Sequence, residues 1–219
     1  MIKDNVLEAR RRIEFACLKV KRDPTAVKLV AVSKNRSIEE IKEASLAGIT
    51  EFGENRVQEA LSKYEAKLPI QWHMVGHLQT NKVKEAVKIF DLIQSVDSQR
   101  LAQEIDKQAA GINKIQEILL EVKTSQEKTK FGLRPDELPG FLKTAGQLKN
   151  ISVKGLMTIA PVVDNPQEAR PYFRILKELR NRINPAFILS MGMTGDFQVA
   201  IEEGADIIRV GRAIFEGTI

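Results

Sequence analysis

Apolar and polar positions alternate regularly along the chain: short runs rich in apolar or β-branched residues are each followed by a longer stretch with helical periodicity. The short runs predict buried strands at Lys28–Val32, Ile49–Phe52, Gln71–Val75, Asp91–Val96, Gln116–Val122, Ser152–Met157, Ala186–Leu189 and Asp206–Val210. The longer stretches predict helices at Ser37–Ala47, Asn55–Leu68, Thr80–Ile89, Ser98–Ala110, Pro135–Ala145, Pro166–Ile183 and Asp196–Glu203, with a stub at Ala213–Gly217. The pattern therefore predicts eight strand–helix pairs.

Strands that alternate with helices favour a parallel sheet, and eight such pairs favour closure of that sheet into a barrel. We expect residues 1–219 to form one α/β domain, a (β/α)8 TIM barrel, with an extra amphipathic helix at Asn5–Lys21 before the first strand. That helix is expected to cover the part of the barrel that the short eighth helix leaves open. An open doubly wound sheet is the alternative, but no glycine-rich fingerprint follows the first strand.

Composition and charge exclude several classes of function. The chain has 219 residues and a net charge of +5, its acidic and basic residues are interleaved, and aromatic residues make up only 5%. A nucleic-acid-binding surface favours a basic stripe with aromatic residues, so we expect no nucleic-acid partner. No stretch approaches the roughly 20 apolar residues of a membrane span, and the charged segment Met1–Arg12 is unlike a secretory signal. We expect a cytoplasmic protein, with its single cysteine, Cys17, buried as an apolar residue.

The residues that follow the strands are the candidates for chemistry, because the active sites of such barrels form at the carboxyl ends of the strands. Lys34 directly follows the first strand, where partial burial can make its amine a nucleophile. The alternative is an exposed lysine at the start of a loop. Asn55 follows the second strand, where it either binds a ligand or caps the next helix.

Two histidines, His73 and His77, lie four residues apart around the third strand. That spacing makes a metal pair on a helix, but here the first histidine lies in a strand and the second in a loop, without a cysteine or an acidic cluster beside them. We therefore expect no metal site. His77, at the mouth of the barrel, is the candidate for ligand binding, and His73 is expected to be packed inside.

Glycine turns follow the seventh and eighth strands, where the phosphate sites of barrels recur. The candidates for binding phosphate are Ser190, Gly192, Met193, Thr194 and Gly211. Backbone N–H groups, hydroxyls and the start of a helix at Asp196 together favour an anion. Two ordinary turns before a capped helix are the alternative.

Arg209 lies inside the eighth strand, and an arginine is costly to bury without a partner. The partner is either a ligand acceptor in the barrel mouth or a neighbouring carboxylate such as Glu51 or Glu121. The first and eighth strands are neighbours in a closed barrel, so an amine, a guanidinium and a phosphate loop converge there. That set suits a phosphorylated aldehyde cofactor, with the aldehyde on Lys34 and the ring nitrogen at Arg209.

A family resemblance covers essentially the whole chain. It rests on Val30–Lys34, Phe52–Glu59, Gly76–Lys82, Gly155–Met157, Leu189–Met193, and Val210–Gly211 with Ile214–Phe215. With these segments the chain resembles the YggS/PROSC family of pyridoxal phosphate homeostasis proteins, whose fold is similar to the N-terminal barrel domain of alanine racemase.

The resemblance implies that pyridoxal 5'-phosphate is held as a Schiff base on Lys34 and that Arg209 faces its pyridine nitrogen. The residues that it implies around the phosphate are Ser190, Gly192, Met193, Thr194 and Gly211. The residues that it implies along the pocket are Asn55, His77 and Met157. The family often has serine where Thr194 stands, and that exchange keeps the hydroxyl.

The resemblance also bears on catalysis. An arginine at the ring nitrogen leaves that nitrogen unprotonated, which makes the ring a weaker electron sink. Alanine racemase uses a tyrosine base from a second domain, whereas this chain stops at Ile219 and its tyrosines, Tyr64 and Tyr172, lie in predicted helices. We therefore expect a monomeric cytoplasmic carrier of pyridoxal phosphate, without robust turnover.

The expected role is in vitamin B6 and amino-acid homeostasis, with pyridoxal-phosphate-dependent apo-enzymes as partners that receive the cofactor. One alternative is a pyridoxal-phosphate-dependent enzyme such as a slow amino-acid racemase. Another is a Schiff-base aldolase that acts on a sugar phosphate with the same amine and phosphate loops.

Overall fold

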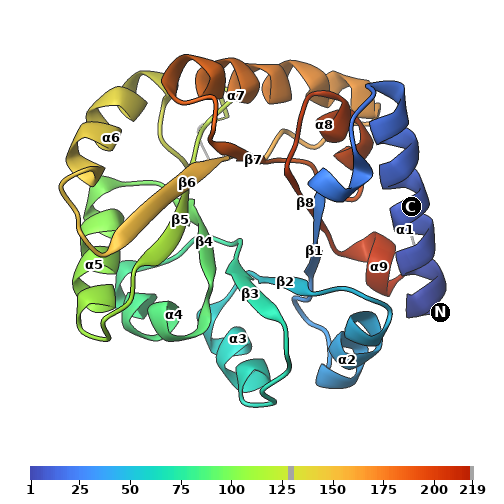
Figure 1. Cartoon of the computed structure of the whole chain (residues 1–219), viewed down its shortest axis with the longest axis horizontal. Coiled ribbons are helices and arrows are strands. Elements are labelled where there is room, and N and C mark those ends of the chain that lie inside the picture. The colour runs from blue at the N-terminus through green and yellow to red at the C-terminus, as the bar shows by residue number, and fades with distance from the viewer. Residues whose placement is uncertain (128–130, 218–219) are drawn as a thin grey trace.

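The strands form a closed barrel in the order β1 to β8, as shown in the computed structural model, which describes residues 1–127 and 131–217 (Figure 1). The strands are β1 (Lys28–Val32), β2 (Glu51–Glu54), β3 (Gln71–Met74), β4 (Leu92–Val96), β5 (Gln116–Glu121), β6 (Ile151–Met157), β7 (Ile188–Ser190) and β8 (Ile207–Val210). All neighbours are parallel, and β8 closes the ring by pairing with β1. The predicted (β/α)8 barrel is confirmed, and the open sheet is excluded.

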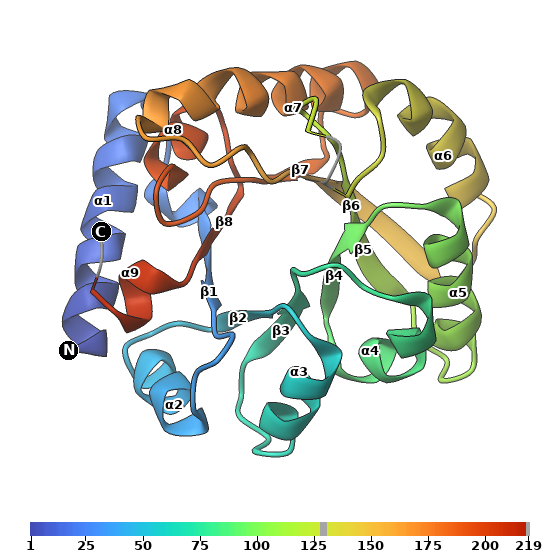
Figure 2. The same cartoon turned by 180° about the vertical axis from the view of Figure 1, so that it is seen from behind.

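A helix follows each strand and packs outside the barrel (Figure 2). The α-helices are α1 (Ile2–Lys19), α2 (Ile38–Leu46), α3 (Val57–Tyr64), α4 (Val83–Ile89), α5 (Gln99–Ala110), α6 (Leu138–Ala145), α7 (Arg170–Ile183), α8 (Phe197–Glu202) and α9 (Arg212–Phe215). Short 3-10 turns are η1 (Pro24–Ala26), η2 (Thr80–Lys82), η3 (Pro135–Glu137) and η4 (Pro166–Ala169). Within the described parts of the chain, no helix is both long and apolar enough to cross a membrane.

Two strands, β2 and β7, begin two residues later than the sequence predicts, and local hydrogen bonds explain both differences. Ile49 N donates to Ala44 O across Gly48, whose φ is +93°, so Ile49 still belongs to the turn that ends α2. In the same way, Asn184 Oδ1 accepts a hydrogen bond from Ala186 N and holds that residue in a turn before β7. Turn hydrogen bonds therefore remove these residues from the sheet.

The N-terminal helix α1 covers the side of the barrel where α9 is only four residues long. It packs against α8, α9 and α2 (Figure 1), and Asn5 Nδ2 donates a hydrogen bond to Ile214 O at 2.9 Å. Its buried face consists of Ile2, Val6, Ala9, Ile13, Ala16 and Cys17. The expected covering helix and the buried cysteine are both confirmed.

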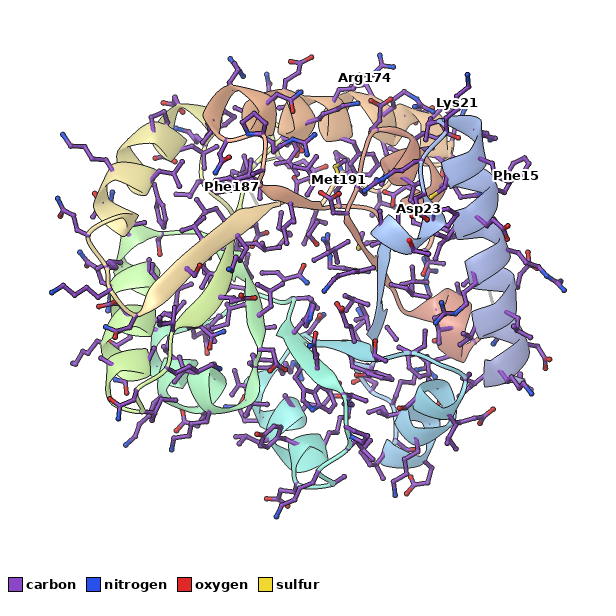
Figure 3. All side chains as sticks on the ribbon, in the orientation of Figure 1. Phe15, Lys21, Asp23, Arg174, Phe187 and Met191 are labelled. Carbon is purple, nitrogen blue, oxygen red and sulfur yellow. The ribbon has the colours of Figure 1, made fainter. Side chains whose placement is uncertain are left out.

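The inside of the barrel contains both apolar and polar side chains. A small apolar cluster, separate from the main core between strands and helices, contains Val30, Leu92, Leu119, Met157 and Ile207. Side chains alternate along a strand with a period of two, so residues two places further on also point inward. These include Gln94, Glu121 and Arg209. In Figure 3 side chains fill the ring of strands, while Phe15 of α1 and Arg174 of α7 lie on the outer rim.

Candidate functional site

Lys34 lies in a tight turn directly after β1 and is exposed, so the expected partial burial of this lysine is wrong. Ser33 N donates to Gly53 O of β2 at 2.9 Å, and Arg36 N donates back to Ser33 O at 3.0 Å. Asn35 has a left-handed backbone, with φ +59°. The chain leaves β1 sharply as a result, and the Lys34 side chain lines a cavity of about 180 Å³ at the barrel mouth.

A buried ionic cluster, formed by Lys63, Glu54, Glu59 and Ser33, lies beside this turn. Lys63 Nζ donates to Glu54 Oε1, Glu59 Oε1 and Ser33 O, each at 2.7 Å. Ser33 Oγ donates to Glu54 Oε1 at 2.6 Å, and Asn35 N donates to Glu59 Oε1. Both residues that flank the exposed lysine are therefore tied to one buried ammonium group.

Prediction from strand ends missed this cluster because Lys63 belongs to a helix. The sequence does contain a signal: Val57, Ala60 and Lys63 recur at every third position on the buried face of α3, so a lysine occupies an apolar position. Burial raises the pKa of Glu54, and its hydrogen bonds to Lys63 and Ser33 work against that rise. The stability of the Glu54 carboxylate thus depends on the lysine.

A continuous polar chain of five buried side chains runs through the inside of the barrel. Arg209 Nη1 donates to Ser190 Oγ at 2.5 Å, and Ser190 Oγ donates to Gln94 Oε1 at 2.6 Å. Gln94 Nε2 donates to His73 Nδ1 at 2.8 Å, and His73 Nε2 faces Glu51 Oε2 at 3.4 Å. The three hydrogen bonds all point from the guanidinium towards His73, which fixes the position of each hydrogen between them.

Burial lowers the pKa of His73 to about 3. Its imidazole is therefore neutral at pH 7, as acceptance of a hydrogen bond at Nδ1 requires. The prediction that His73 is packed inside is confirmed. Gln94 was not predicted, and its signal in the sequence is a glutamine within β4, a strand in which every residue is buried.

Arg209 faces the same cavity as Lys34. It is 4% exposed, its Nη2 donates to Thr158 O at 2.8 Å, and no carboxylate among the described residues forms an ion pair with it. The expected alternatives of a salt bridge to Glu51 or Glu121 are therefore wrong. Burial lowers the pKa of Arg209 to about 10, so the side chain is still a cation at neutral pH.

The loop after β7 turns at Gly192, whose φ is +94°. A Cβ at this position would lie 2.6 Å from Ala200 Cβ, so both the conformation and the space require glycine. Met193 N donates to Asp196 Oδ1 at 2.6 Å, which holds the loop against the start of α8. The sequence located this loop correctly from its glycines and from the start of the helix.

A second cavity, of about 330 Å³, adjoins this loop, and its lining includes Thr194, Gly195 and Gly211. Lys34, Met193 and Arg209 line both this cavity and the smaller one. The structure therefore brings together the predicted amine, the predicted guanidinium and the predicted phosphate loops.

Asn55 and His77 line the smaller cavity. The N-cap residue of α3 is Arg56, so the alternative that Asn55 caps this helix is wrong. His77 Nδ1 lies 3.2 Å from Asp97 Oδ2, and its ring stacks on Phe131 with 3.7 Å between ring centroids. Both predicted residues are therefore at the barrel mouth, and His77 is held there from two sides.

Two further predicted residues lie beneath the cavities. Met157 is fully buried in the apolar cluster inside the barrel, and Ser190 is fully buried in the polar chain. The Ser190 hydroxyl accepts a hydrogen bond from Arg209 and gives its only proton to Gln94. Its contact with the site therefore runs through the guanidinium.

Glu121, at the end of β5, also lines the cavity of Lys34, although the sequence suggested it only as a partner for Arg209. The side chain is 6% exposed. Burial, and then the charge of Asp97, raise the pKa of Glu121 to about 7. In the part of the chain that the structure describes, no three His, Cys, Asp or Glu side chains gather so that they could hold a metal ion.

Comparison with known sequences points to one family. The family described as "Alanine racemase, N-terminal domain" matches residues 10–218. The chain is 45% identical over 211 residues to the pyridoxal phosphate homeostasis protein of Aquifex aeolicus (strain VF5), covering 93% of this chain and 92% of that protein. It is 35% identical over 224 residues to the protein of the same name from Pasteurella multocida (strain Pm70), covering 98% and 96%.

Solved structures agree with this comparison. PipY of Synechococcus elongatus PCC7942, solved with PLP bound, matches with a TM-score of 0.85 and 36% identity, covering 98% of this chain and 100% of PipY. Alanine racemase of Clostridium difficile 630 matches with a TM-score of 0.74 and 14% identity, covering 96% of this chain and 56% of the racemase. At that identity the second match shows the fold alone.

Proposed function

Because the chain belongs to the pyridoxal phosphate homeostasis protein family, we propose that it binds pyridoxal 5'-phosphate as a Schiff base on Lys34 and acts in the intracellular supply of this cofactor. The observation that supports the proposal is that three groups line the same two cavities. They are the Lys34 amine, the Arg209 guanidinium and the glycine loops at Met193–Gly195 and Gly211. Pyridoxal phosphate offers an aldehyde, a ring nitrogen and a phosphate, one for each of them.

The chemistry of these side chains fits the cofactor. Lys34 is an exposed primary amine, and the bound cofactor supplies an aldehyde carbon that such amines attack. Arg209 has only donors, so a ring nitrogen that faces it accepts a hydrogen bond and carries no proton. The Thr194 hydroxyl and the backbone N–H groups of the loop suit a phosphate. Asn55 and His77 would line the pocket at the mouth.

The remaining proposed residues shape the site from below. Gly192 gives the phosphate loop its left-handed turn, and Ser190 orients Arg209 through a hydrogen bond at 2.5 Å. Met157 would form the apolar floor of the pocket, from its place in the cluster inside the barrel.

Carriage of the cofactor fits these residues better than rapid turnover. Arg209 keeps the ring nitrogen unprotonated, so the ring withdraws electrons weakly. Tyr64 and Tyr172 lie on α3 and α7, outside the barrel, so neither offers a base at the mouth. A slow amino-acid racemase is the second candidate, favoured by the Glu121 carboxyl in the cavity of Lys34. Exchange of an amino acid's Cα proton with solvent deuterium would identify that activity.

Borohydride reduction after incubation with pyridoxal phosphate, followed by peptide mass spectrometry, tests the proposal. We expect a yellow protein with a pyridoxyl adduct on Lys34, and loss of both in Lys34→Ala. Lys123→Ala is the matched control, because it removes a lysine from the adjacent cavity and should keep both signals. A colourless protein without the adduct would refute the proposal and favour an aldolase that acts on a sugar phosphate.

We also propose that the recipients are apo-enzymes that require the cofactor, and that the protein acts in the cytoplasm as a monomer. Loaded protein mixed with excess apo-enzyme should lose its colour at the rate at which enzyme activity appears. Light scattering should give the mass of one 24.6 kDa chain. Twice that mass would contradict the monomer.

A further inference from the structure

Glu121 lies across the barrel mouth from Lys34. It ends β5, and β5 is four strands away from β1 in the closed ring of eight, so the two strands lie on opposite sides (Figure 1). Leu119 belongs to the inward-facing apolar cluster, and alternation along the strand turns Glu121 inward as well. Both Lys34 and Glu121 line the cavity of about 180 Å³, which has room for a few water molecules at about 30 Å³ each.

The Glu121 carboxylate is buried and has no hydrogen-bond donor. Its side chain is 6% exposed, and no group in residues 1–127 or 131–217 donates a hydrogen bond to either carboxylate oxygen. Glu54, in contrast, receives hydrogen bonds from Lys63 and Ser33. A carboxylate that the protein does not hydrogen-bond depends on water in the cavity for its solvation, and partial loss of that hydration costs free energy. Its position in the cavity that Lys34 also lines therefore points to a role in the chemistry of that cavity.

Charges from several elements of the mouth act on this carboxyl. The charged and titratable groups around it are Lys34, His77, Asp97, Lys123 and Arg209. Burial is the largest influence and raises the pKa of Glu121, Asp97 adds to the rise, and Arg209 and Lys123 oppose it, with a result of about 7. His77 Nδ1 lies 3.2 Å from Asp97 Oδ2. The carboxyl thus gains and loses its proton near neutral pH.

We propose that Glu121 is the acid–base group through which Lys34 forms and breaks its bond to the cofactor, an inference that rests on the proposed function. The Lys34 ammonium gives a proton to the Glu121 carboxylate, directly or through water in the cavity. The free amine adds to the aldehyde carbon, and the carbonyl oxygen takes the proton that the nitrogen then releases. The Glu121 carboxyl protonates this hydroxyl, the C–O bond breaks, and water leaves. An ammonium and an aldehyde become a protonated imine and water, and Glu121 ends unchanged.

Release of the cofactor follows the same steps in reverse, so Glu121 should set the rate of both directions. In a stopped-flow experiment, apo-protein is mixed with pyridoxal phosphate and the yellow absorbance of the imine is followed. Glu121→Gln keeps the shape and removes the proton-transfer group, so both rates should fall on the order of 100-fold at neutral pH. Their ratio, the equilibrium constant, should change far less than either rate. Glu117→Gln, the same substitution at an exposed position of β5, should leave both rates unchanged.

The pH dependence separates this role from a merely structural one. In the unsubstituted protein the loading rate should rise with pH through the titration of Glu121 near 7 and then level off. In Glu121→Gln it should keep rising towards about pH 10.4, where a lysine amine is neutral without help, so the defect disappears there. Asp97→Asn removes a charge that raises the pKa of Glu121, and should move the break in the profile to lower pH. This variant keeps the test available even where Glu121→Gln fails to fold.

Two results would overturn the inference while the Schiff base on Lys34 stands. One is loading of Glu121→Gln at the unsubstituted rate around neutral pH. The other is a defect of the same size at every pH, since an acid–base role must vanish once the amine is neutral. Absence of any pyridoxyl adduct on Lys34 in the unsubstituted protein would overturn the proposed function together with this inference.

Discussion

Replacing Lys63 by methionine removes the cation of the buried ionic cluster and leaves Glu54 buried without a counter-charge. Glu54 is fully buried, the Lys63 side chain is 8% exposed, and their atoms are 2.7 Å apart, so solvent screens this pair very little. Loss of one partner from a buried pair costs about 3–5 kcal/mol. The free energy of unfolding of such a domain is about 5–15 kcal/mol. We therefore expect Lys63→Met to lose a large fraction of its stability.

Urea unfolding, followed by the fluorescence of Trp72, the single tryptophan, measures this loss. Trp72 is 2% exposed, so its emission should change when the barrel opens. The turn that carries Lys34 loses its anchor in the same variant. We expect affinity for pyridoxal phosphate to fall about tenfold or more in the protein that is still folded, which corresponds to about 1.4 kcal/mol.

Two controls make the result specific to the buried charge. Lys28→Met also breaks a lysine–glutamate pair, but the Lys28 side chain is 58% exposed, so the loss should stay below about 1 kcal/mol. The double variant Glu54→Gln with Lys63→Met removes both charges and should recover much of the stability. Two results would contradict this expectation. One is a loss of unfolding free energy in Lys63→Met no larger than in Lys28→Met, and the other is a double variant less stable than Lys63→Met alone.

Three further predictions concern the polar chain, the phosphate loop and pH. Gln94→Leu leaves the buried groups on either side of it unpaired, and thermal unfolding should report a loss of about 1–3 kcal/mol; an unchanged midpoint would contradict this. Gly192→Ala places a Cβ 2.6 Å from its neighbour at a φ of +94°, so it should weaken both stability and cofactor affinity, whereas Gly140→Ala in α6, whose Cβ meets nothing within 4 Å, should weaken neither. In Glu121→Gln, the free energy of unfolding should fall by about 3 kcal/mol as the pH falls from 6.5 to 4.5. Protonation of His73 in the unfolded chain causes this fall, and the substitution removes the opposing contribution of Glu121.

The sign of the pH effect follows from the direction of each shift. The pKa of His73 in the folded protein, about 3, is below its ordinary 6.5, so its stabilising contribution is complete above pH 6.5 and is lost as the pH falls. The pKa of Glu121, about 7, is above its ordinary 4.5, so its contribution is complete below pH 4.5 and is lost as the pH rises to about 7. The two slopes oppose each other between pH 4.5 and 6.5. Urea unfolding at each pH measures the free energy of unfolding of the unsubstituted protein and of Glu121→Gln. The same dependence on pH in both proteins would show that the pKa of Glu121 is not raised.

The barrel and most of its site could be predicted because both follow from strand ends. Short apolar runs alternate with helical stretches, and the carboxyl ends of parallel strands must meet at one face. Position alone therefore predicted that Lys34, Arg209 and the loop at Met193–Gly195 meet at the barrel mouth, where they line one cavity. The starts of β2 and β7 were placed two residues too early, because the backbone at Ile49 and the side chain of Asn184 make turn hydrogen bonds that compete with the sheet.

Lys63, Gln94 and Glu121 could not be assigned from the sequence, for a common physical reason. Each is a polar residue at a buried position, which a sequence can reveal, but its role depends on which side chain lies opposite. Lys63 reaches the turn after β1 from a helix outside the barrel. Gln94 joins residues of β3 and β7 across the interior. Such pairings depend on the register and closure of the whole barrel, which no local pattern contains.

The site joins the first strand of the barrel to the last: Lys34 follows β1, whereas Arg209 belongs to β8. A chain still emerging from the ribosome thus displays the amine long before the guanidinium and the final glycine turn are made. Cofactor that meets an unfinished chain would find the lysine without Arg209 and Gly211 beside it. On the proposed function, the complete site exists only once synthesis has closed the ring.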